Sequence, residues 1–511
     1  MKVLYDICAV AHFSALGLLS LYGLHRLWML AAWSRLDGNP PPHGRTPDAA
    51  GFRPKVTVQL PLYNERFVAE RLIDAVARLD WPSHSLEIQV LDDSTDDTRD
   101  IIAGRASFWR EQGVDISHIA RSNRRGYKAG ALAEGLTTAK GEFIAVFDAD
   151  FTPGRDFLRK TIPCFSDPKV GMVQTRWGFR NADHSFLTAV QALLLGPHFA
   201  IEHQVRYSKG LFFNFNGTAG VWRRKAIESA GGWRPDTVTE DLDLSYRAQM
   251  AGWRFVYLNH YCVPSELPVT FSAFRVQQQR WAKGSIQTAR RILPGLLSRA
   301  LPLPVKCEAM AHLLANFCWL IGSIVFLTLY PAVVARVWVG PREMLFLDAP
   351  LFLATTVAIL AYFFAFLRAE GQERSLRRLM FLPVISIGLA PSIALSVLKG
   401  VWSRGGVFDR TPKFGITGRS ALPLQAFLYR NANLPYLLLN FILFCYSLLP
   451  LWFAWQRGTW YSLPFFALFP GAFLYVLIQE TREALNMRGP FPSPSAMFTK
   501  FNSTRNTPHA D

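Results

Sequence analysis

The stretch EFIAVFDADFTPG, residues 142–154, contains the pattern that decides the fold of this chain. A short apolar run leads into Asp148 and Asp150, and a Pro-Gly pair then interrupts the chain. Such a run, bounded by turn residues, is typical of a buried β-strand. Because side chains at i and i+2 of an extended segment project to the same side, both carboxylates can reach one cation. The alternative is a capped polar turn that closes the strand.

Two earlier segments repeat this pattern of an apolar strand that ends in polar residues. KVTVQLPLYNE (55–65) is followed by helical spacing over 65–81, and LEIQVLDDSTDDT (86–98) is followed by a helix-like segment over 99–113. Strands and helices that alternate in this way predict a doubly wound α/β domain with a parallel sheet. Ligands bind such sheets beyond the carboxyl ends of the strands. The polar residues expected there are Tyr63, Asn64, Glu65, Asp92, Asp93, Asp148 and Asp150.

The composition limits the class of partner. The chain has 511 residues, with 55 Lys and Arg against 38 Asp and Glu, and a formal net charge of +17. This charge favours an anionic partner such as a phospholipid surface, nucleotide phosphates or nucleic acid. No zinc-finger spacing or low-complexity basic tail supports nucleic acid, which we therefore exclude. The 6 cysteines are scattered singly, which argues for a reducing cytosol and against a cysteine metal site.

The anion-binding groups must be basic side chains and a metal, because no glycine-rich phosphate loop of either common kind follows the first strand. Oxygen ligands such as Asp148 and Asp150 suit Mg²⁺ or Mn²⁺, which bind through one or two carboxylates and substrate phosphates. Basic residues gather in RSNRRGYKAGAL (121–132), where glycines flank Lys128. A solvated helix face is the alternative for this segment.

Two further motifs carry polar groups suited to catalysis. VTEDLDLSYR (238–247) places Glu240, Asp241 and Asp243 at the start of a helical pattern. Acids there complement the helix dipole, and a general base is the alternative role for one of them. The segment QQQRWAKG offers an arginine suited to phosphate beside an indole that can stack on a sugar ring. Its candidate residues are Gln277, Arg280, Trp281 and Lys283.

Apolar runs long enough to span a bilayer, about 20 residues, indicate a membrane protein. They lie near 5–33, 309–337, 346–367, 435–455 and 460–479. The first is interpreted as an uncleaved anchor, with a cleaved signal peptide as the alternative. A sixth run, 378–401, is interrupted by two prolines. If it crossed, the basic loop after it would be external, so the positive-inside rule favours five crossings over six.

These runs divide the chain into six parts. We expect a transmembrane anchor (1–33), a cytosolic catalytic domain (34–308) that ends in interfacial helices (285–308), two transmembrane helices (309–370), an interfacial segment with a cytosolic loop (371–434), two more transmembrane helices (435–480) and a disordered cytosolic tail (481–511).

In this order the motifs resemble those of processive family 2 glycosyltransferases of the cellulose synthase superfamily. The family pattern of Asp, Asp-x-Asp, Thr-Glu-Asp and Gln-x-x-Arg-Trp reads here as Asp92/Asp93, Asp148-Ala-Asp150, Thr239-Glu240-Asp241 and Gln277-Gln-Gln-Arg280-Trp281. Longer stretches such as VQTRWGFRNAD and ELPVTFSAFRVQQQRWAKG are similar to the plant cellulose synthase-like A and C groups. Those groups make β-1,4-mannan or glucomannan and the glucan backbone of xyloglucan. The likeness covers about 55–285.

The resemblance implies a GT-A type nucleotide-sugar-binding domain between membrane helices, in an inverting hexosyltransferase of the inner or plasma membrane. It makes Asp241 the catalytic base and Asp148 and Asp150 the ligands of Mg²⁺ or Mn²⁺. The residues implied for the nucleotide are Tyr63, Glu65, Asp92, Asp93, Lys128 and Asp148. Those implied for the diphosphate and the acceptor are Gln277, Arg280 and Trp281, with Lys128 also on the diphosphate.

The resemblance leaves the substrate open. The donor is UDP-glucose or GDP-mannose, and the acceptor is the end of a growing β-linked glucan or mannan that is passed through the membrane. A non-processive transferase that glycosylates a membrane lipid is the alternative, and a transporter with an inactive nucleotide-binding domain is a third hypothesis. Membrane lipid is an expected partner, and the oligomeric state stays open.

The family also has a gating loop after its interfacial segment, with the approximate motif Phe-x-Val-Thr-x-Lys. VFDRTPKFG (407–415) matches it at Phe408, Thr411 and Lys413, with Arg410 in place of valine. The alternative is an ordinary basic cytosolic loop.

Overall fold

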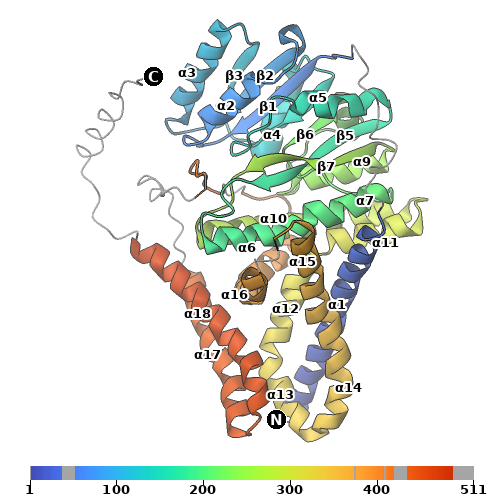
Figure 1. Cartoon of the computed structure of the whole chain (residues 1–511), viewed down its shortest axis with the longest axis vertical. Coiled ribbons are helices and arrows are strands. Elements are labelled where there is room, and N and C mark those ends of the chain that lie inside the picture. Colours follow the sequence, from blue (N-terminus) through green and yellow to red (C-terminus); the bar gives the residue numbers. More distant parts are fainter. Residues whose placement is uncertain (1, 37–51, 373–375, 408–409, 419–433, 487–511) are drawn as a thin grey trace.

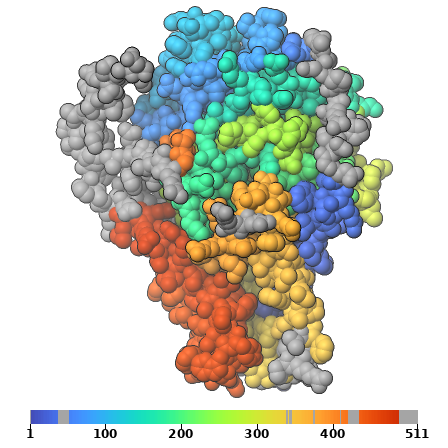
Figure 2. Space-filling view, in the orientation of Figure 1, coloured from blue at the N-terminus to red at the C-terminus, as the bar shows by residue number. Residues whose placement is uncertain are grey.

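The structure, a computed structural model, describes residues 2–36, 52–372, 376–407, 410–418 and 434–486. A domain built on a seven-stranded sheet stands on a bundle of long helices (Figure 1). Figure 2 shows that the sheet domain is broader than the bundle below it.

The sheet has the strand order β3-β2-β1-β4-β6-β5-β7. Its strands are β1 (Val56–Leu62), β2 (Leu86–Asp92), β3 (Ile116–Ala120), β4 (Phe143–Val146), β5 (Val170–Phe179), β6 (Gly220–Arg223) and β7 (Arg254–Ser265). Strands β1 to β4 pair in parallel, and so do β5 and β7, whereas β6 runs antiparallel to β4 and β5. The α/β prediction is confirmed, but the expectation of a wholly parallel sheet is wrong. After β5 the chain passes through helices towards the bundle, and it returns as β6 in the opposite direction.

Helices cover both faces of the sheet, which explains why its strands read as nearly continuous apolar runs. One core packs Val58, Ile73, Ile88 and Phe147 between the sheet and its helices, and a second core on other strands and helices includes Leu132 and Trp222. The helices of this domain are α2 (Ala69–Ala77), α3 (Thr98–Glu111), α4 (Tyr127–Thr138), α5 (Phe157–Thr161), α8 (Arg224–Ser229) and α9 (Glu240–Met250).

The strand order reverses between β1 and β4. The chain leaves β1 towards β2 on one side and later enters β4 on the other side. A crevice forms at the carboxyl ends of strands where such a reversal occurs. The segments around Tyr63 and Asp148, which follow β1 and β4, therefore face the same crevice.

The bundle and its junction with the sheet domain are helical. They comprise α1 (Lys2–Trp33), α6 (Phe186–Pro197), η4 (His198–His203), α7 (Gln204–Ser208), α10 (Phe271–Ser298), α11 (Leu303–Leu313), α12 (Phe317–Leu327), α13 (Leu329–Val339), α14 (Pro341–Phe352), η5 (Leu353–Val357), α15 (Ala358–Ala369), α16 (Leu376–Trp402), α17 (Leu434–Gln456) and α18 (Leu463–Asn486). Within the described residues, five helices are long and apolar enough to cross a membrane: Lys2–Trp33, Phe346–Ala369, Leu376–Trp402, Leu434–Gln456 and Trp460–Leu485. The pair α11 and α12, bent by 57°, makes a sixth if it is one span.

Helix α16 covers the run that was expected to lie at the membrane surface. It packs against α10, α12 and α18, and it is the most buried of the five apolar helices. Figure 1 shows α16 nearly end-on beneath α10, across the direction of α17 and α18. This orientation favours the interfacial placement, which stays a prediction.

The predicted tail begins too early. Helix α18 continues to Asn486, so residues 481–486 are helical, and the rest of the tail lies outside the described residues. Glu480 pairs with the buried Arg275 of α10, and the Glu483 carboxylate accepts a hydrogen bond of 3.2 Å from the Ser272 amide. Carboxylates are favourable at a helix N-terminus, so the start of α10 stabilises the end of α18.

Candidate functional site

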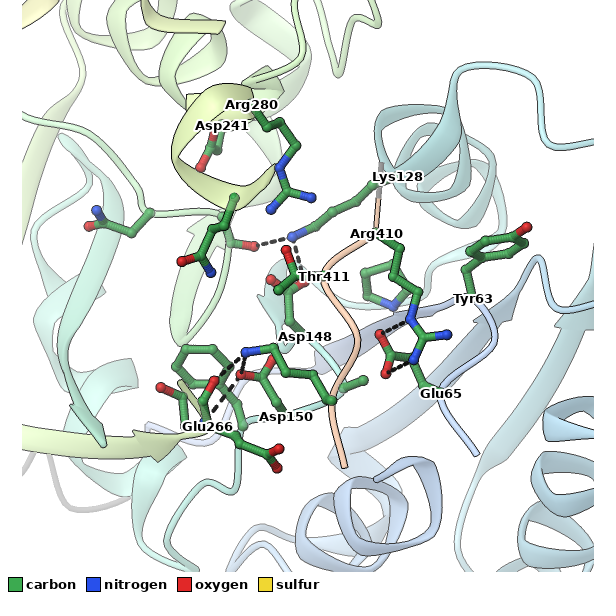
Figure 3. A pocket seen from close by; sticks show the side chains of 18 of the residues that line it. Tyr63, Glu65, Lys128, Asp148, Asp150, Asp241, Glu266, Arg280, Arg410 and Thr411 are labelled. Atoms are coloured by element: carbon green, nitrogen blue, oxygen red, sulfur yellow. Dashed lines mark hydrogen bonds and ion pairs between the residues drawn. The ribbon is translucent and has the colours of Figure 1, made fainter. Parts of the chain in front are cut away.

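One cavity opens at the carboxyl ends of β1 and β4 (Figure 3). Loops after the strands, the N-terminal turns of α4 and α9, one face of α10 and a loop after α16 form its walls. It is lined by every site residue that the family resemblance implies except Asp92: Tyr63, Glu65, Asp93, Lys128, Asp148, Asp150, Asp241, Gln277, Arg280 and Trp281. Of the other candidates, Glu240 also lines it, whereas Asn64, Asp243 and Lys283 do not.

Asp92 lies outside the cavity, so it does not share a binding surface with Asp93. Its buried carboxylate accepts hydrogen bonds of 2.8 Å from the Ser94 amide and 2.8 Å from the His118 ring. Burial opposes the charge, but these two bonds hold the pKa of Asp92 below its usual value. Successive residues of a strand point to opposite sides, so only one of the two acids can face the cavity. Asp93 lines the cavity and Asp92 does not, and the assignment of Asp92 to the nucleotide stays a prediction.

Tyr63 and Arg124 form a flat platform at one end of the cavity. The Arg124 guanidinium lies 3.4 Å from the centre of the Tyr63 ring, a stacked cation–π contact. Asp93 lies nearby and is held by Arg121, whose Nε donates to it over 2.6 Å. An aromatic face beside planar guanidinium groups suits a planar heterocycle.

Lys128 joins the two acidic sides of the cavity. Its ammonium bonds to Asp148 and donates a hydrogen bond of 2.9 Å to the Gly217 carbonyl. Burial lowers the pKa of Lys128, but Asp148 and then Glu240 outweigh this effect, so the net shift is upward. Lys128 is therefore a fixed positive charge between the Asp-x-Asp loop and α9.

Asp148 and Asp150 fit a hard divalent cation. Among the described residues, no group of three or more His, Cys, Asp or Glu could hold a metal, so an ion here needs other ligands. Mg²⁺ and Mn²⁺ bind in this way, through one or two carboxylates and substrate phosphates. The Asp150 carboxylate is paired with a cation in this structure, since the Lys413 ammonium lies 2.7 Å from its Oδ2.

Asp241 stands in the first turn of α9, on the other side of Lys128. A Cβ built on Gly217 would lie 2.9 Å from Asp241 Oδ2 and 3.4 Å from Lys128 Nζ, so these groups share one corner. Burial, and then the neighbouring Glu240, raise the pKa of Asp241. A carboxylate with a raised pKa in a cavity has the properties of a general base.

Helix α10 supplies the wall opposite the strands, with Gln277, Arg280 and Trp281. Thr270 caps this helix by accepting a hydrogen bond of 3.3 Å from the Ala273 amide, which fixes the position of the first turns. Figure 3 shows Arg280 directed towards Lys128. Two cations from separate elements therefore converge on the space above Asp148.

Glu266 was not predicted from the sequence, and Arg410 was predicted only as part of a gating-like loop. Glu266 is buried beside Asp150, and Arg410 lines the cavity with Thr411 and Lys413. A lone acid in SELPV, just before the Gln-x-x-Arg-Trp helix, was the only local signal for Glu266. Phe408 of the gating-like motif lies outside the described residues.

Comparison with known proteins agrees with this geometry. Residues 54–284 match the family described as "Glycosyltransferase like family 2". The chain is similar to glucomannan 4-beta-mannosyltransferase 1 of Oryza sativa subsp. japonica, at 45% identity over 277 residues, which are 53% of this chain and 52% of that protein. It is similar to glucomannan 4-beta-mannosyltransferase 7 of Arabidopsis thaliana, at 36% identity over 414 residues, which are 77% of this chain and 71% of that protein.

A solved structure shares the fold. The mannosyltransferase of Pyrobaculum calidifontis, in complex with GDP-Man and Mn²⁺, superimposes with a TM-score of 0.51 at 21% identity. The match covers 78% of this chain and 99% of that one.

Proposed function

The chain belongs to glycosyltransferase family 2, alongside the plant glucomannan 4-beta-mannosyltransferases, and from this premise we propose that it transfers mannose from GDP-mannose to the end of a β-linked mannan or glucomannan. The observation that most supports this function is the pair of hydrogen bonds that the Lys128 ammonium donates to the Asp148 carboxylate and to the Gly217 carbonyl. These bonds hold the Lys128 ammonium, a positive charge suited to a diphosphate, next to Asp241, the proposed base. The relatives named for mannosyl transfer support mannose as the sugar.

In the proposed reaction the acceptor hydroxyl attacks C1 of the sugar from the face opposite the diphosphate. The bond between C1 and the phosphate oxygen breaks, its electron pair leaves with the diphosphate, and the anomer inverts to β. Asp241 takes the hydroxyl proton, and Lys128, Gln277 and Arg280 bind the diphosphate as its charge develops. Trp281 offers its indole face to the acceptor sugar.

Asp148 and Asp150 would hold Mg²⁺ or Mn²⁺ together with the phosphates of the donor. The ion supplies charge stabilisation for the leaving diphosphate when it is bound. Tyr63, Glu65 and Asp93 are the residues we assign to the nucleoside, with the aromatic ring under the base.

The apolar helices support a membrane location, with the sheet domain on the cytosolic side where nucleotide sugars are found. We propose that the polymer leaves through the helix bundle. The alternative, a single transfer to a membrane lipid, is an outcome of the test below.

The function is tested with the purified full chain in detergent or liposomes and a panel of nucleotide sugars. With Mn²⁺ or Mg²⁺ we expect GDP release from GDP-mannose and a mannan that shortens under β-mannanase. If UDP-glucose were the only nucleotide sugar from which diphosphate is released, the donor would be UDP-glucose and not GDP-mannose. A product that is short and extractable into organic solvent would favour the lipid acceptor instead.

Replacing Gly217 by alanine tests how closely the base and Lys128 must be placed. Gly217 has φ +82, and its new Cβ would press on Asp241. We expect kcat to fall by about tenfold or more, because small misplacements of catalytic groups are costly. Gly210→Ala is the matched control, since Gly210 has φ +64 but open space around it. Both variants should lose about 1–2 kcal/mol of stability from the left-handed backbone, but only Gly217→Ala should lose activity. Equal kinetics in the two would contradict the proposal.

A further inference from the structure

Two histidines of the π-helix η4 hold a residue of the cavity wall between them. The π-helix follows Pro197, which has no N–H to donate to the preceding turn. In an α-helix, residues five apart point about 140° away from each other. A π-helix has i→i+5 hydrogen bonds and a wider turn, which here puts the His198 and His203 rings 4.4 Å apart. The two rings can therefore bind one side chain from both sides.

The side chain that they bind is Asn216, which lines the cavity. Asn216 Oδ1 accepts a hydrogen bond of 2.6 Å from the His203 ring, and Asn216 Nδ2 donates over 3.1 Å to His198 Nε2. The backbone is fixed separately, because the Asn216 amide donates to the buried Gln174 side chain over 3.0 Å. A side-chain NH2 has two hydrogens, and His198 accepts only one of them. The second can be donated to a ligand in the cavity.

Glu202 determines which end of the Asn216 side chain faces His198. An ionised carboxylate can only accept hydrogen bonds, so His198 Nδ1, which lies 3.4 Å from Glu202 Oε2, carries the ring proton. His198 Nε2 is then an acceptor, and it needs the NH2 end of Asn216. Burial opposes the charge on Glu202, but Arg26 and His198 outweigh burial, so the pKa of Glu202 lies well below its ordinary value. The reverse orientation of Asn216 would direct a lone pair of His198 at the carboxylate.

A second N–H donor of the cavity wall also rests on η4. Trp177 lines the cavity and stacks on Phe199, with ring centres 5.0 Å apart and planes 30° apart. Its indole Nε1 is buried and has no hydrogen-bond partner among the described residues. A buried donor without a partner is costly unless another group supplies an acceptor. These two N–H groups therefore suit a ligand rich in oxygen, such as a sugar.

We propose that His198 is a positioning residue, which orients Asn216 so that its second Nδ2–H bonds to an oxygen of the acceptor sugar. This inference rests on the proposed function, because that function brings an acceptor hydroxyl to Asp241. Gly217, the residue after Asn216, shares one corner of the cavity with Asp241 and Lys128. Asn216 therefore lies beside the sugar whose hydroxyl Asp241 deprotonates. The donor sugar is the other candidate ligand, and the test separates the two.

Steady-state kinetics of the purified full chain, with GDP-mannose and a soluble β-1,4-linked manno-oligosaccharide, test the proposal. His198→Leu frees the Asn216 side chain to turn, so we expect the KM for the oligosaccharide to rise about 5–10-fold, the loss of one hydrogen bond. The KM for GDP-mannose and kcat should stay within about twofold, because this bond is equally strong before and during the reaction. His198→Gln should restore the wild-type KM, since a glutamine oxygen can accept from Asn216 as the imidazole Nε2 does.

His312→Leu is the matched control. His312 is half-buried like His198 and bonds to the Tyr246 hydroxyl at 2.8 Å, but neither His312 nor Tyr246 lines the cavity. This variant should lower the thermal midpoint and leave both KM values unchanged. Asn216→Ala should raise the KM for the oligosaccharide as His198→Leu does. The double variant should show no further rise, because both changes remove the same bond.

The proposal is overturned if the two losses add in the double variant, or if His198→Leu lowers kcat and leaves the KM for the oligosaccharide unchanged. A rise in the KM for GDP-mannose instead would place Asn216 on the donor sugar and also overturn it. Asn216→Ala leaves His198 intact, so an unchanged KM for the oligosaccharide in this variant decides against the proposal even if His198→Leu does not fold. If the wild type releases no GDP with the oligosaccharide present, the proposed function itself fails.

Discussion

Asp241→Asn is expected to reduce kcat by about 10²–10⁴-fold, because it removes the proton acceptor from the attacking hydroxyl. Asparagine keeps the size of the side chain and its bond to the start of α9, where Asp241 Oδ1 accepts from the Leu242 amide over 2.8 Å. The fold and the affinity for nucleotide should therefore survive. Diphosphate release and product length, both measured with GDP-mannose, report the loss.

Asp243, two residues after Asp241 in α9, provides a matched control. The Asp243 carboxylate is paired with Arg247 at 2.7 Å and does not line the cavity. Asp243→Asn should therefore lower the thermal stability while kcat stays within a few-fold of the wild type. Full transfer by Asp241→Asn would falsify the assignment of the base.

The pH profile of the wild type follows from the same residue. Burial and Glu240 raise the pKa of Asp241, and a general base works only when it is deprotonated. The ordinary pKa of an aspartate is about 4, and the acidic limb of kcat/KM should therefore lie at a higher pH than this. Activity is lost as the pH falls through this raised pKa. A limb at the ordinary value would show that another group accepts the proton.

Lys128→Met should lower kcat by about 10²–10³-fold, as expected when a preorganised charge that stabilises the leaving group is removed. Methionine fills much of the same space, so the loss reports the ammonium. Lys140→Met is the control, because the half-exposed Lys140 pairs with Asp115 and with the buried Glu87, and none of these residues lines the cavity. The control should keep the kinetics of the wild type. Equal kinetics in both variants would exclude a role for Lys128 on the diphosphate.

The same variant has a stability signature with a definite sign. The pKa of folded Lys128 lies above its ordinary value, so its contribution to stability is complete below the pKa of the unfolded lysine. It is lost only as the pH rises through the higher folded pKa. At neutral pH, Lys128→Met therefore leaves Asp148 and Asp241 without their cation and lowers the thermal midpoint. This deficit should shrink only as the pH rises through the folded pKa of Lys128, where the wild-type lysine loses its charge.

The fold and much of the site could be predicted because their signals are local. Apolar runs that end in acids predicted the first strands, and the strand order explains why those acids meet in one crevice. Three features were not predictable in this way. The antiparallel direction of β6 follows from the path of the chain through the helices. Asp92 bonds to His118 instead of lining the cavity, and this depends on which side of β2 is covered. The helical end of α18 is stabilised by contacts with α10, such as the pair of Glu480 with Arg275.

The sequence by itself was enough to propose the chemistry of this protein, because the Asp-x-Asp, Thr-Glu-Asp and Gln-x-x-Arg-Trp motifs each place their polar groups within a few residues of chain. Only the tertiary structure decided how these groups are paired. Lys413 and Asp150 are 263 residues apart, and Glu266 bonds both to Asp150 and to the Phe414 amide of the loop after α16. Such contacts arise from burial of charges that must find partners in the folded chain, and no local spacing records which partner they find.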